Sequence, residues 1–269
     1  MSEEILFGTS GELSAREDAA IHVINKVRDT IISSCDKCDN GFIEVPSKSK
    51  KIEDLVVGSV KECSCRDKAA WVTKLIYSGI PRQFIASDSI DLSAMDKRSV
   101  ETVKHYINKI DKAHENGLGL FFCGSQIPVP NANIARQQMA IKVLLTALEK
   151  NYTAHYIDMN SYIALQRSAA RDGSYNGFLD EINAVDFLCL DNIGNVTMTE
   201  YMAGNFVSMI SDRVLNKKPV IMLSHKPWDK IRVWFTEQVA DMIAYNCVKV
   251  QIAEYKKKVA EFATIKGRL

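Results

Sequence analysis

The chain has 269 residues, of which 46% are hydrophobic and 25% are charged, and its formal net charge is +1. This balance is typical of a globular protein with room for one full domain and a smaller one, and it neither favours nor excludes a nucleic-acid partner. No apolar run reaches the roughly 18 residues that span a bilayer, and the acidic start Met1–Glu4 lacks a signal-peptide pattern. We therefore expect no membrane partner and a cytoplasmic location.

Residues 13–33 carry apolar side chains at helical spacing, which predicts an amphipathic helix. These side chains are Ala19, Ile21, Val23, Ile24, Val27, Ile31 and Ile32. The apolar face packs either on its own domain or on a partner protein, because periodicity alone does not distinguish the two.

Four of the seven cysteines fall in two close pairs, Cys35-x-x-Cys38 and Cys63-x-Cys65. Gly41 follows the first pair and permits the tight turn of a metal-binding knuckle. The second pair completes the four ligands of a tetrahedral structural zinc site. The alternatives are incidental cysteines or a redox pair, which would open a helix of a thioredoxin-like unit that the pattern does not show. The other three cysteines lie in apolar strand-like runs and are expected in the core: Cys123, Cys189 and Cys247.

A short helix is expected over residues 67–77, and the glycine and proline within residues 78–84 break it. A longer helix follows, capped by Ser93 or Asp96 and ending near His114. From residue 118 onward, strands alternate with helices, which predicts a parallel sheet with both faces covered. The expected strands are 118–124, 155–158, 185–191, 219–224 and 247–252, and the expected helices are 133–150, 161–170, 175–182, 200–215 and 235–245.

The chain is accordingly divided into three parts. Residues 1–78 form an N-terminal helix and zinc-knuckle domain for partner docking, residues 79–117 a linker and helix, and residues 118–269 an α/β domain. The tail, 254–269, carries five basic residues, which form either a solvated helix or a patch that contacts phosphate.

An apolar run beginning at Val185 ends at Asp191 and Asn192, and Gly194 then permits a turn. Open α/β sheets bind ligands beyond the carboxyl ends of their strands, where an aspartate can hold the magnesium ion of a nucleotide. The alternative is structural, since core strands often end in Asp or Asn where a turn follows.

A phosphate-binding loop would follow the strand that ends at Gly124. Such a loop needs glycines, whose backbone N–H groups surround the phosphates, and then a Lys and a Ser or Thr. Residues 124–137 contain one glycine, two prolines and no Gly-Lys-Thr. This segment alone would not predict a nucleotide site.

Short pieces nevertheless recur along the chain in a characteristic order. They are the knuckle with Asn40-Gly41-Phe42, the Cys63-x-Cys65 pair, the Gly-Ile-Pro entry at 79–84, the strand into Gly124, the strand end at 185–194, the helix ending in Arg213, and the strand at 219–225. Together they resemble the DnaC/DnaI/IstB family of AAA+ proteins, the bacterial and phage replicative helicase loaders. The resemblance covers most of the chain from Cys35 onward. It implies an α/β, parallel-sheet AAA+ (P-loop NTPase-like) domain behind a small helical zinc-knuckle domain.

The resemblance also implies roles for single residues. Asp191 would be the magnesium-binding carboxylate, Arg213 an arginine finger that reaches a neighbouring subunit of a homo-oligomer, and Ser224 the sensor residue. Arg136 and Gln137, beyond Gly124, fall near the family's Lys-Thr.

The chain departs from the family at four of these positions. Arg136 replaces the lysine, Gln137 the magnesium-binding hydroxyl, Asn192 the second acidic residue, and His225 the sensor asparagine. Losing transition-state contacts of about 2–4 kcal/mol each leaves little hydrolysis. We therefore expect structural Zn²⁺ and a degenerate ATPase module, for which ATP and Mg²⁺ binding is an open question.

Residues 161–183 stand where these loaders resemble initiators in carrying extra helices that face single-stranded DNA. Arg167 and Arg171 would meet phosphates, while Tyr162 and Tyr175 would stack on bases. The alternative is a solvated segment with ordinary helix packing.

The sequence thus predicts a DNA replication accessory protein, similar to a helicase loader, that docks on a replicative DNA helicase or another replisome protein and contacts single-stranded DNA. One alternative is an active ATP-hydrolysing loader with an unusual phosphate loop. Another is a non-catalytic paralogue or inhibitor of a replisome protein. The glycine-poor loop hints at a phage copy, which would work in the cytosol of a bacterial host.

Overall fold

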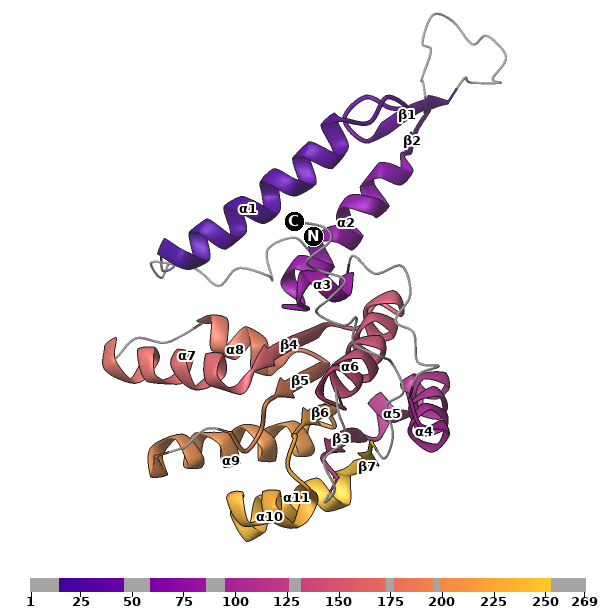
Figure 1. The fold of residues 1–269 in the computed structure, drawn as a ribbon. Coiled ribbons are helices and arrows are strands. Elements are labelled where there is room, and N and C mark those ends of the chain that lie inside the picture. The colour runs from indigo at the N-terminus through magenta and orange to yellow at the C-terminus, as the bar shows by residue number, and fades with distance from the viewer. Residues whose placement is uncertain are drawn as a thin grey trace, which may run out of the picture. The chain divides into compact units, whose positions relative to one another are not determined.

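The computed structural model describes residues 15–45, 59–85, 95–125, 132–172, 177–195 and 199–252. Several predictions fall outside the described residues: the loop 126–131, the side chain of Arg171, Tyr175 and the tail 254–269. The chain divides into two compact units at Tyr77 and Ser78 (Figure 1).

The first unit is a pair of helices joined by a two-stranded antiparallel hairpin. Its elements are α1 (Ala15–Ser33), β1 (Phe42–Val45), β2 (Ser59–Glu62) and α2 (Ser64–Tyr77). The two helices pack against each other, and Ile24, Ala69 and Leu75 are buried. The predicted apolar face of the N-terminal helix therefore packs, at least in part, on its own unit. Because α2 begins at Ser64, Cys65 lies in its first turn.

The second unit is an α/β domain built on one parallel sheet. Its strands are β3 (Gly119–Cys123), β4 (Ala154–Asp158), β5 (Phe187–Asp191), β6 (Val220–Leu223) and β7 (Cys247–Gln251). Its helices are α3 (Arg82–Ile85), α4 (Lys97–Asn108), α5 (Ile110–Glu115), α6 (Ala132–Glu149), α7 (Met159–Asp172), α8 (Gly177–Ala184), α9 (Glu200–Leu215), α10 (Trp228–Trp234) and α11 (Glu237–Asn246). The strand order is β4-β5-β6-β3-β7, and every pairing is parallel. The predicted fold class is confirmed.

Helices cover both faces of this sheet, as its apolar strands require. Figure 1 shows α6 and α4 on one side and α7, α9 and α11 on the other. Every residue of β3 and β5 is buried. Since side chains alternate along a strand and Tyr156 pairs with Cys189, Tyr156 and Asp191 lie on the same face, the one that α6 covers.

Residues 95–117 pack on the sheet rather than forming a separate linker. Asp96 caps α4 by accepting from the backbone N–H of Ser99 at 2.9 Å. The Ser99 hydroxyl donates to the Gln251 carbonyl at 3.1 Å, and the Tyr106 hydroxyl donates to the Leu118 carbonyl at 2.6 Å. The single helix expected here is two helices with a break at Lys109. Helix α10 was not expected, because seven residues after a proline are too few to show a helical period.

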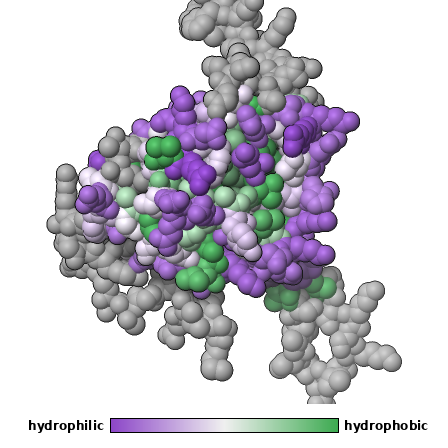
Figure 2. All heavy atoms as spheres, turned by 90° about the horizontal axis from the view of Figure 1, so that it is seen from below, coloured by the Kyte–Doolittle hydropathy of each residue, from purple (hydrophilic) through white to green (hydrophobic). Residues whose placement is uncertain are grey.

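Surface hydrophobic residues are scattered on the face seen in Figure 2, where hydrophilic residues cover most of the described surface around small hydrophobic patches. Across the described part of the second unit, the large exposed apolar side chains are Ile134, Tyr201, Leu215, Val233 and Tyr245. Within the described ranges, no helix combines the length and the apolar character that a membrane crossing needs.

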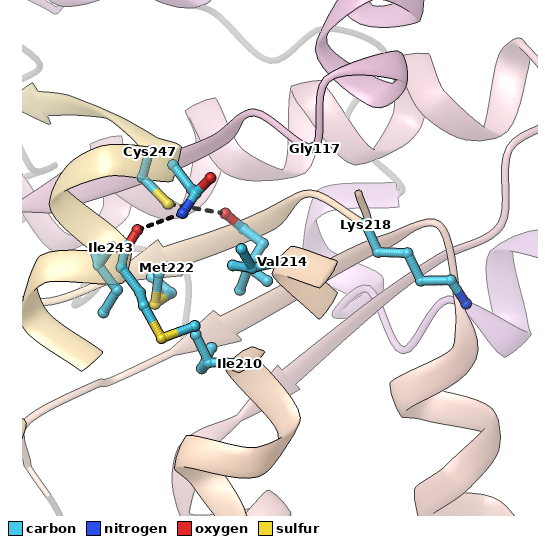
Figure 3. Close-up of a pocket in the computed structure, with 10 residues that line it drawn as sticks. Gly117, Ile210, Val214, Lys218, Met222, Ile243 and Cys247 are labelled. Atoms are coloured by element: carbon cyan, nitrogen blue, oxygen red, sulfur yellow. Dashed lines mark hydrogen bonds between the residues drawn. The ribbon is translucent and has the colours of Figure 1, made fainter. Parts of the chain in front are cut away.

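A small apolar cavity lies between α9, α11 and β6, lined by Ile210, Val214, Met222, Ile243 and Cys247 among others (Figure 3). Its volume of about 10 Å³ is at most that of one water molecule. It is a packing defect of the core and not a ligand site.

Arg213 of α9 is buried, with 2% of its surface exposed, and its guanidinium bonds four backbone carbonyls. Nη1 donates to the carbonyls of Asn183 and Val185 at 2.7 and 3.0 Å, and Nη2 donates to those of Asp186 and Pro219 at 2.9 Å each. Burial lowers the pKa of this guanidinium to about 10, while Asp186 and Tyr162 act in the opposite direction. The side chain thereby joins the chain entering β5 to the chain entering β6.

We expect Arg213→Lys to lower the free energy of unfolding by about 3–5 kcal/mol, because one ammonium cannot serve four carbonyls in a planar arrangement. Urea denaturation would measure the loss. Arg232→Lys on α10 is the matched control, since Arg232 makes an exposed ion pair with Asp241, and its effect should stay within about 0.5 kcal/mol. Equal effects of the two changes would contradict a stabilising role for the four hydrogen bonds of Arg213.

Candidate functional site at the carboxyl edge of the sheet

Polar side chains gather at the carboxyl ends of β4, β5 and β6. Asp158 ends β4 and Asp191 ends β5, and the two are register partners. Ser224 follows β6, and the first turns of α6 supply Arg136 and Gln137. Carboxyl ends of parallel strands meet at one edge, which is where open α/β sheets bind ligands.

Asp191 is 5% exposed, and both of its carboxylate oxygens are hydrogen-bonded. Oδ2 accepts from Nε2 of Gln137 at 2.7 Å and from the Tyr156 hydroxyl, and Oδ1 accepts from the backbone N–H of Asn192 at 2.7 Å. Burial raises the pKa of the Tyr156 phenol, and Cys189 and Asp191 add to the rise, so the phenol stays protonated and donates. A carboxylate shielded from water needs such donors.

Asn192 serves as a partner of the second strand-end aspartate. Its φ of 61° lies in the left-handed region, which Asn tolerates better than most residues. Its side-chain nitrogen donates to Oδ2 of Asp158. Oδ1 of Asp158 accepts from the backbone N–H and the side-chain amide of Asn160 at 2.8 and 2.9 Å.

Gly124, at the end of β3, is required by a close approach of two backbones. Its N–H donates to the Lys226 carbonyl at 2.9 Å. A Cβ at this position would lie 1.8 Å from the His225 carbonyl oxygen, so no other residue fits without moving the backbone.

Ser224 joins the loop after β6 to the loop after β5. Its buried hydroxyl donates to the Ile193 carbonyl at 2.8 Å and accepts from the backbone N–H of Lys226 at 3.1 Å. The Lys226 ammonium in turn donates to the Gly194 carbonyl. The hydroxyl at the predicted sensor position is thus already engaged within the protein.

Arg136 and Lys226 place positive charge near His225, whose carbonyl lies against Gly124. Arg136 is 4% exposed and donates to the Asn133 side chain. Burial lowers the pKa of Arg136, although the nearby Asp191 opposes the change. Burial also lowers the pKa of His225, and the charges of Lys226 and Arg136 lower it further, so His225 is neutral near pH 7.

The four-cysteine cluster forms a second site, in the first unit. The sulfur atoms of Cys35, Cys38, Cys63 and Cys65 all lie within 4.8 Å of one another. The Cys35–Cys63 and Cys38–Cys65 sulfur distances are 3.9 and 3.5 Å, far longer than a disulfide of about 2.05 Å. Four thiolates about 2.3 Å from a central zinc would be about 3.8 Å apart. The cluster could therefore hold a tetrahedral metal ion.

The knuckle geometry follows from the residues after Cys38. Asn40 and Gly41 have φ values of 47° and 87°, and a Cβ on Gly41 would lie 2.8 Å from Cγ of Arg66. The Gly41 carbonyl accepts from the Cys63 N–H at 2.8 Å, which brings the two cysteine pairs together. The backbone N–H of Cys65 lowers the pKa of the Cys63 thiol to about 7, which favours its thiolate. Burial raises the pKa of the Cys38 thiol and that of Cys65, the latter to about 12, so the case for a metal rests on the geometry of the four sulfur atoms.

Comparison with known proteins identifies the fold of the second unit. Residues 131–260 match the family described as IstB-like ATP binding protein. The structure is similar to the DnaC helicase loader (TM-score 0.54, 17% identity, 64% of this chain and 99% of that one) and to DnaI (TM-score 0.53, 16% identity, 64% and 94%). It is also similar to domain III of the Thermotoga maritima replication initiation protein DnaA (TM-score 0.52, 10% identity, 64% and 68%).

The second unit therefore has the fold of the AAA+ domains of DnaC and DnaI, and most of it resembles the IstB-like family. The resemblance found in the sequence is confirmed. No curated protein matches the chain by sequence. At these identities the structural likeness establishes the fold of the AAA+ domain and leaves its partners to be inferred.

Two site predictions are corrected by burial. Arg213 was expected to be an arginine finger, but all four of its Nη contacts go to carbonyls of its own domain. It therefore offers no support for a homo-oligomer. Tyr162 was expected to stack on bases, but it is 1% exposed and donates to the Asn183 side chain at 3.1 Å. Arg167 is exposed on α7, as a phosphate contact requires.

Tyr156 and Asp158 were not expected at the site. Asp158 carried a signal, because like Asp191 it ends a strand of the parallel sheet. Tyr156 carried none, since a tyrosine within an apolar strand looks like a core residue until the neighbouring strand is placed. Cys123 and Cys189 are buried in the core as predicted, and Cys247 is partly buried.

We expect Asn192→Asp, which restores the acidic pair of the family, to lower the free energy of unfolding near neutral pH by about 1–2 kcal/mol. The change replaces a donor to Asp158 with a second negative charge. The deficit should shrink in acid as the carboxylates protonate. Urea denaturation at neutral and acid pH measures this, with Asn195→Asp in the same loop, where residue 195 is exposed, as the control. Unchanged stability together with new ATP turnover would contradict it.

Proposed function

We propose that the chain is a DNA replication accessory protein, similar to a helicase loader, that works in the cytoplasm. The observation that carries the proposal is the presence in one chain of a DnaC/IstB-type AAA+ domain and a four-cysteine unit. The solved relatives named as a helicase loader and a replication initiation protein support this setting.

The AAA+ domain, in this proposal, does not hydrolyse ATP efficiently. Gln137 and Asn192 replace a hydroxyl and a carboxylate of the family, and both are bonded to strand-end aspartates. Neither is a general base or a hydroxyl ligand. A domain that lacks these groups can still bind partners through its surface.

The first unit is proposed to hold Zn²⁺ through its four cysteines and to dock on the replicative helicase. Four thiolates fill a zinc ion's coordination, so the ion would be structural. The hairpin next to the cluster exposes the apolar side chains of Phe42, Val45 and Val60, and such residues beside charged ones suit a protein partner.

We expect the purified chain to carry about one zinc ion per molecule and Cys38→Ser to lose it, because three thiolates leave the coordination incomplete. Loss of zinc should also abolish binding to the purified replicative helicase of the same cell in size-exclusion chromatography. Cys247→Ser, distant from the cluster in sequence, should keep both properties. A wild-type chain without zinc would disprove the site, and full helicase binding by Cys38→Ser would disprove docking through this unit.

Contact with single-stranded DNA is proposed to involve Arg167 and Arg171 of α7. We expect Arg167→Ala to weaken binding of an oligonucleotide and to reduce the slope of log affinity against log salt by about 0.7, the value for one phosphate contact on a single strand. Fluorescence anisotropy at several salt concentrations would measure it. Arg98→Ala changes an exposed arginine on α4 and should leave the slope unchanged. An unchanged slope for Arg167→Ala would contradict the proposed phosphate contact.

An ATP-hydrolysing loader remains the alternative, with a non-catalytic paralogue or inhibitor as another. ATP turnover measured with and without single-stranded DNA and the helicase distinguishes them. Robust turnover that Asp191→Ala abolishes would favour the active loader. Helicase binding that blocks unwinding, without turnover, would favour the inhibitor.

A further inference from the structure

The Asp191 site differs chemically from a magnesium site. Mg²⁺ binds oxygen ligands in a strict octahedral arrangement, and in nucleotide-binding domains of this kind these include a strand-end carboxylate and a hydroxyl. Here Gln137 stands near the position of the hydroxyl, and it turns an amide N–H toward Asp191 instead of an oxygen toward a metal.

Every short contact of the Asp191 carboxylate comes from a hydrogen-bond donor. Gln137 and Tyr156 share Oδ2, and the backbone N–H of Asn192 occupies Oδ1. An amide nitrogen and a protonated phenol are not magnesium ligands. With Asp191 only 5% exposed, a cation would have to displace these donors in order to reach the carboxylate.

The three donors come from different parts of the AAA+ domain. Gln137 lies on α6, Tyr156 on β4, and Asn192 in the loop after β5. The contacts therefore join the helix after the phosphate-loop segment to the central strands, which is what a bound cation and its ligands would do in a metal-dependent domain.

We propose that Gln137 and Tyr156 take the place of the divalent cation, so that their hydrogen bonds to Asp191, and not Mg²⁺, connect α6 and β4 to the carboxyl end of β5. The residues present do not fit the metal, because the Gln137 amide, the Tyr156 hydroxyl and the backbone N–H of Asn192 all donate to the carboxylate that would bind it. This inference deepens the proposed non-hydrolysing role and rests on it. Helicase docking by the first unit does not enter it.

The test is a titration of Mn²⁺, followed by electron paramagnetic resonance, into the zinc-loaded full chain. The wild type should show no Mn²⁺ site that depends on Asp191, and its thermal midpoint should be the same in Mg²⁺ and in EDTA once zinc loss is excluded by metal analysis.

Gln137→Ser restores a hydroxyl and removes the amide donor. We expect it to gain an Asp191-dependent Mn²⁺ site, at least on the order of tenfold tighter than any residual Mn²⁺ binding by the wild type, and to be stabilised by Mg²⁺. Adding Asp191→Asn should remove both gains.

Gln138→Ser is the matched control, because Gln138 is the next residue of α6 and makes no hydrogen bond to Asp191 in the described structure. It should behave as the wild type. If Gln137→Ser does not fold, Tyr156→Phe removes one donor hydroxyl at little change in volume and should gain a smaller Asp191-dependent Mn²⁺ affinity.

Two results would overturn the inference. One is wild-type Mn²⁺ binding that Asp191→Asn abolishes, and the other is no gain in either folded variant. Helicase binding measured on the same samples keeps the two proposals apart. Its absence from the wild type would count against the proposed function and leave the cation result standing.

Discussion

A carboxylate that is almost shut off from water must have its charge met by donors within the protein, and the arrangement around Asp191 follows from this constraint. The donors come from α6, β4 and the loop after β5, so the requirement of one charge fixes three elements at the carboxyl edge of the sheet. Ser224 and Lys226 connect the loop after β6 to the same edge, because they donate to the Ile193 and Gly194 carbonyls of the loop after β5. At this edge the carboxylate of Asp191 is bonded to groups of its own domain.

In the first unit the constraint is the stability of a small helical pair with a hairpin. Among the described residues, the helix pair and its largely exposed hairpin bury only a few apolar side chains, and a core of that size stabilises a small unit weakly. The four cysteines lie where the hairpin meets both helices, so cross-linking them through a metal ion would join all four elements. The left-handed backbone at Asn40 and Gly41 is what allows the two cysteine pairs to face each other.

Much of the AAA+ domain could be predicted because its strands are short apolar runs and its helices have a clear period. The parallel sheet, its strands and the burial of Cys123 and Cys189 followed from that alternation. Arg213 shows where such reasoning ends. An arginine near the end of a helix can point to a neighbouring subunit or into its own domain. The sequence motif is the same in both cases, and only the four carbonyls around the side chain decide between them.

The sequence by itself determined the fold class, the four cysteines as a possible metal site and the strand-end position of Asp191, because local pattern and spacing are properties of neighbours along the chain. Only the tertiary structure decided that residues 95–117 belong to the AAA+ domain, that Tyr162 lies in the core, and that Gln137 and Tyr156 bond Asp191. Gln137 and Asp191 are 54 residues apart, and a hydrogen bond across that separation exists only once α6 has packed on the sheet. At two positions where the sequence replaces a family residue, Gln137 and Asn192, the replacement donates to a strand-end aspartate in the folded protein.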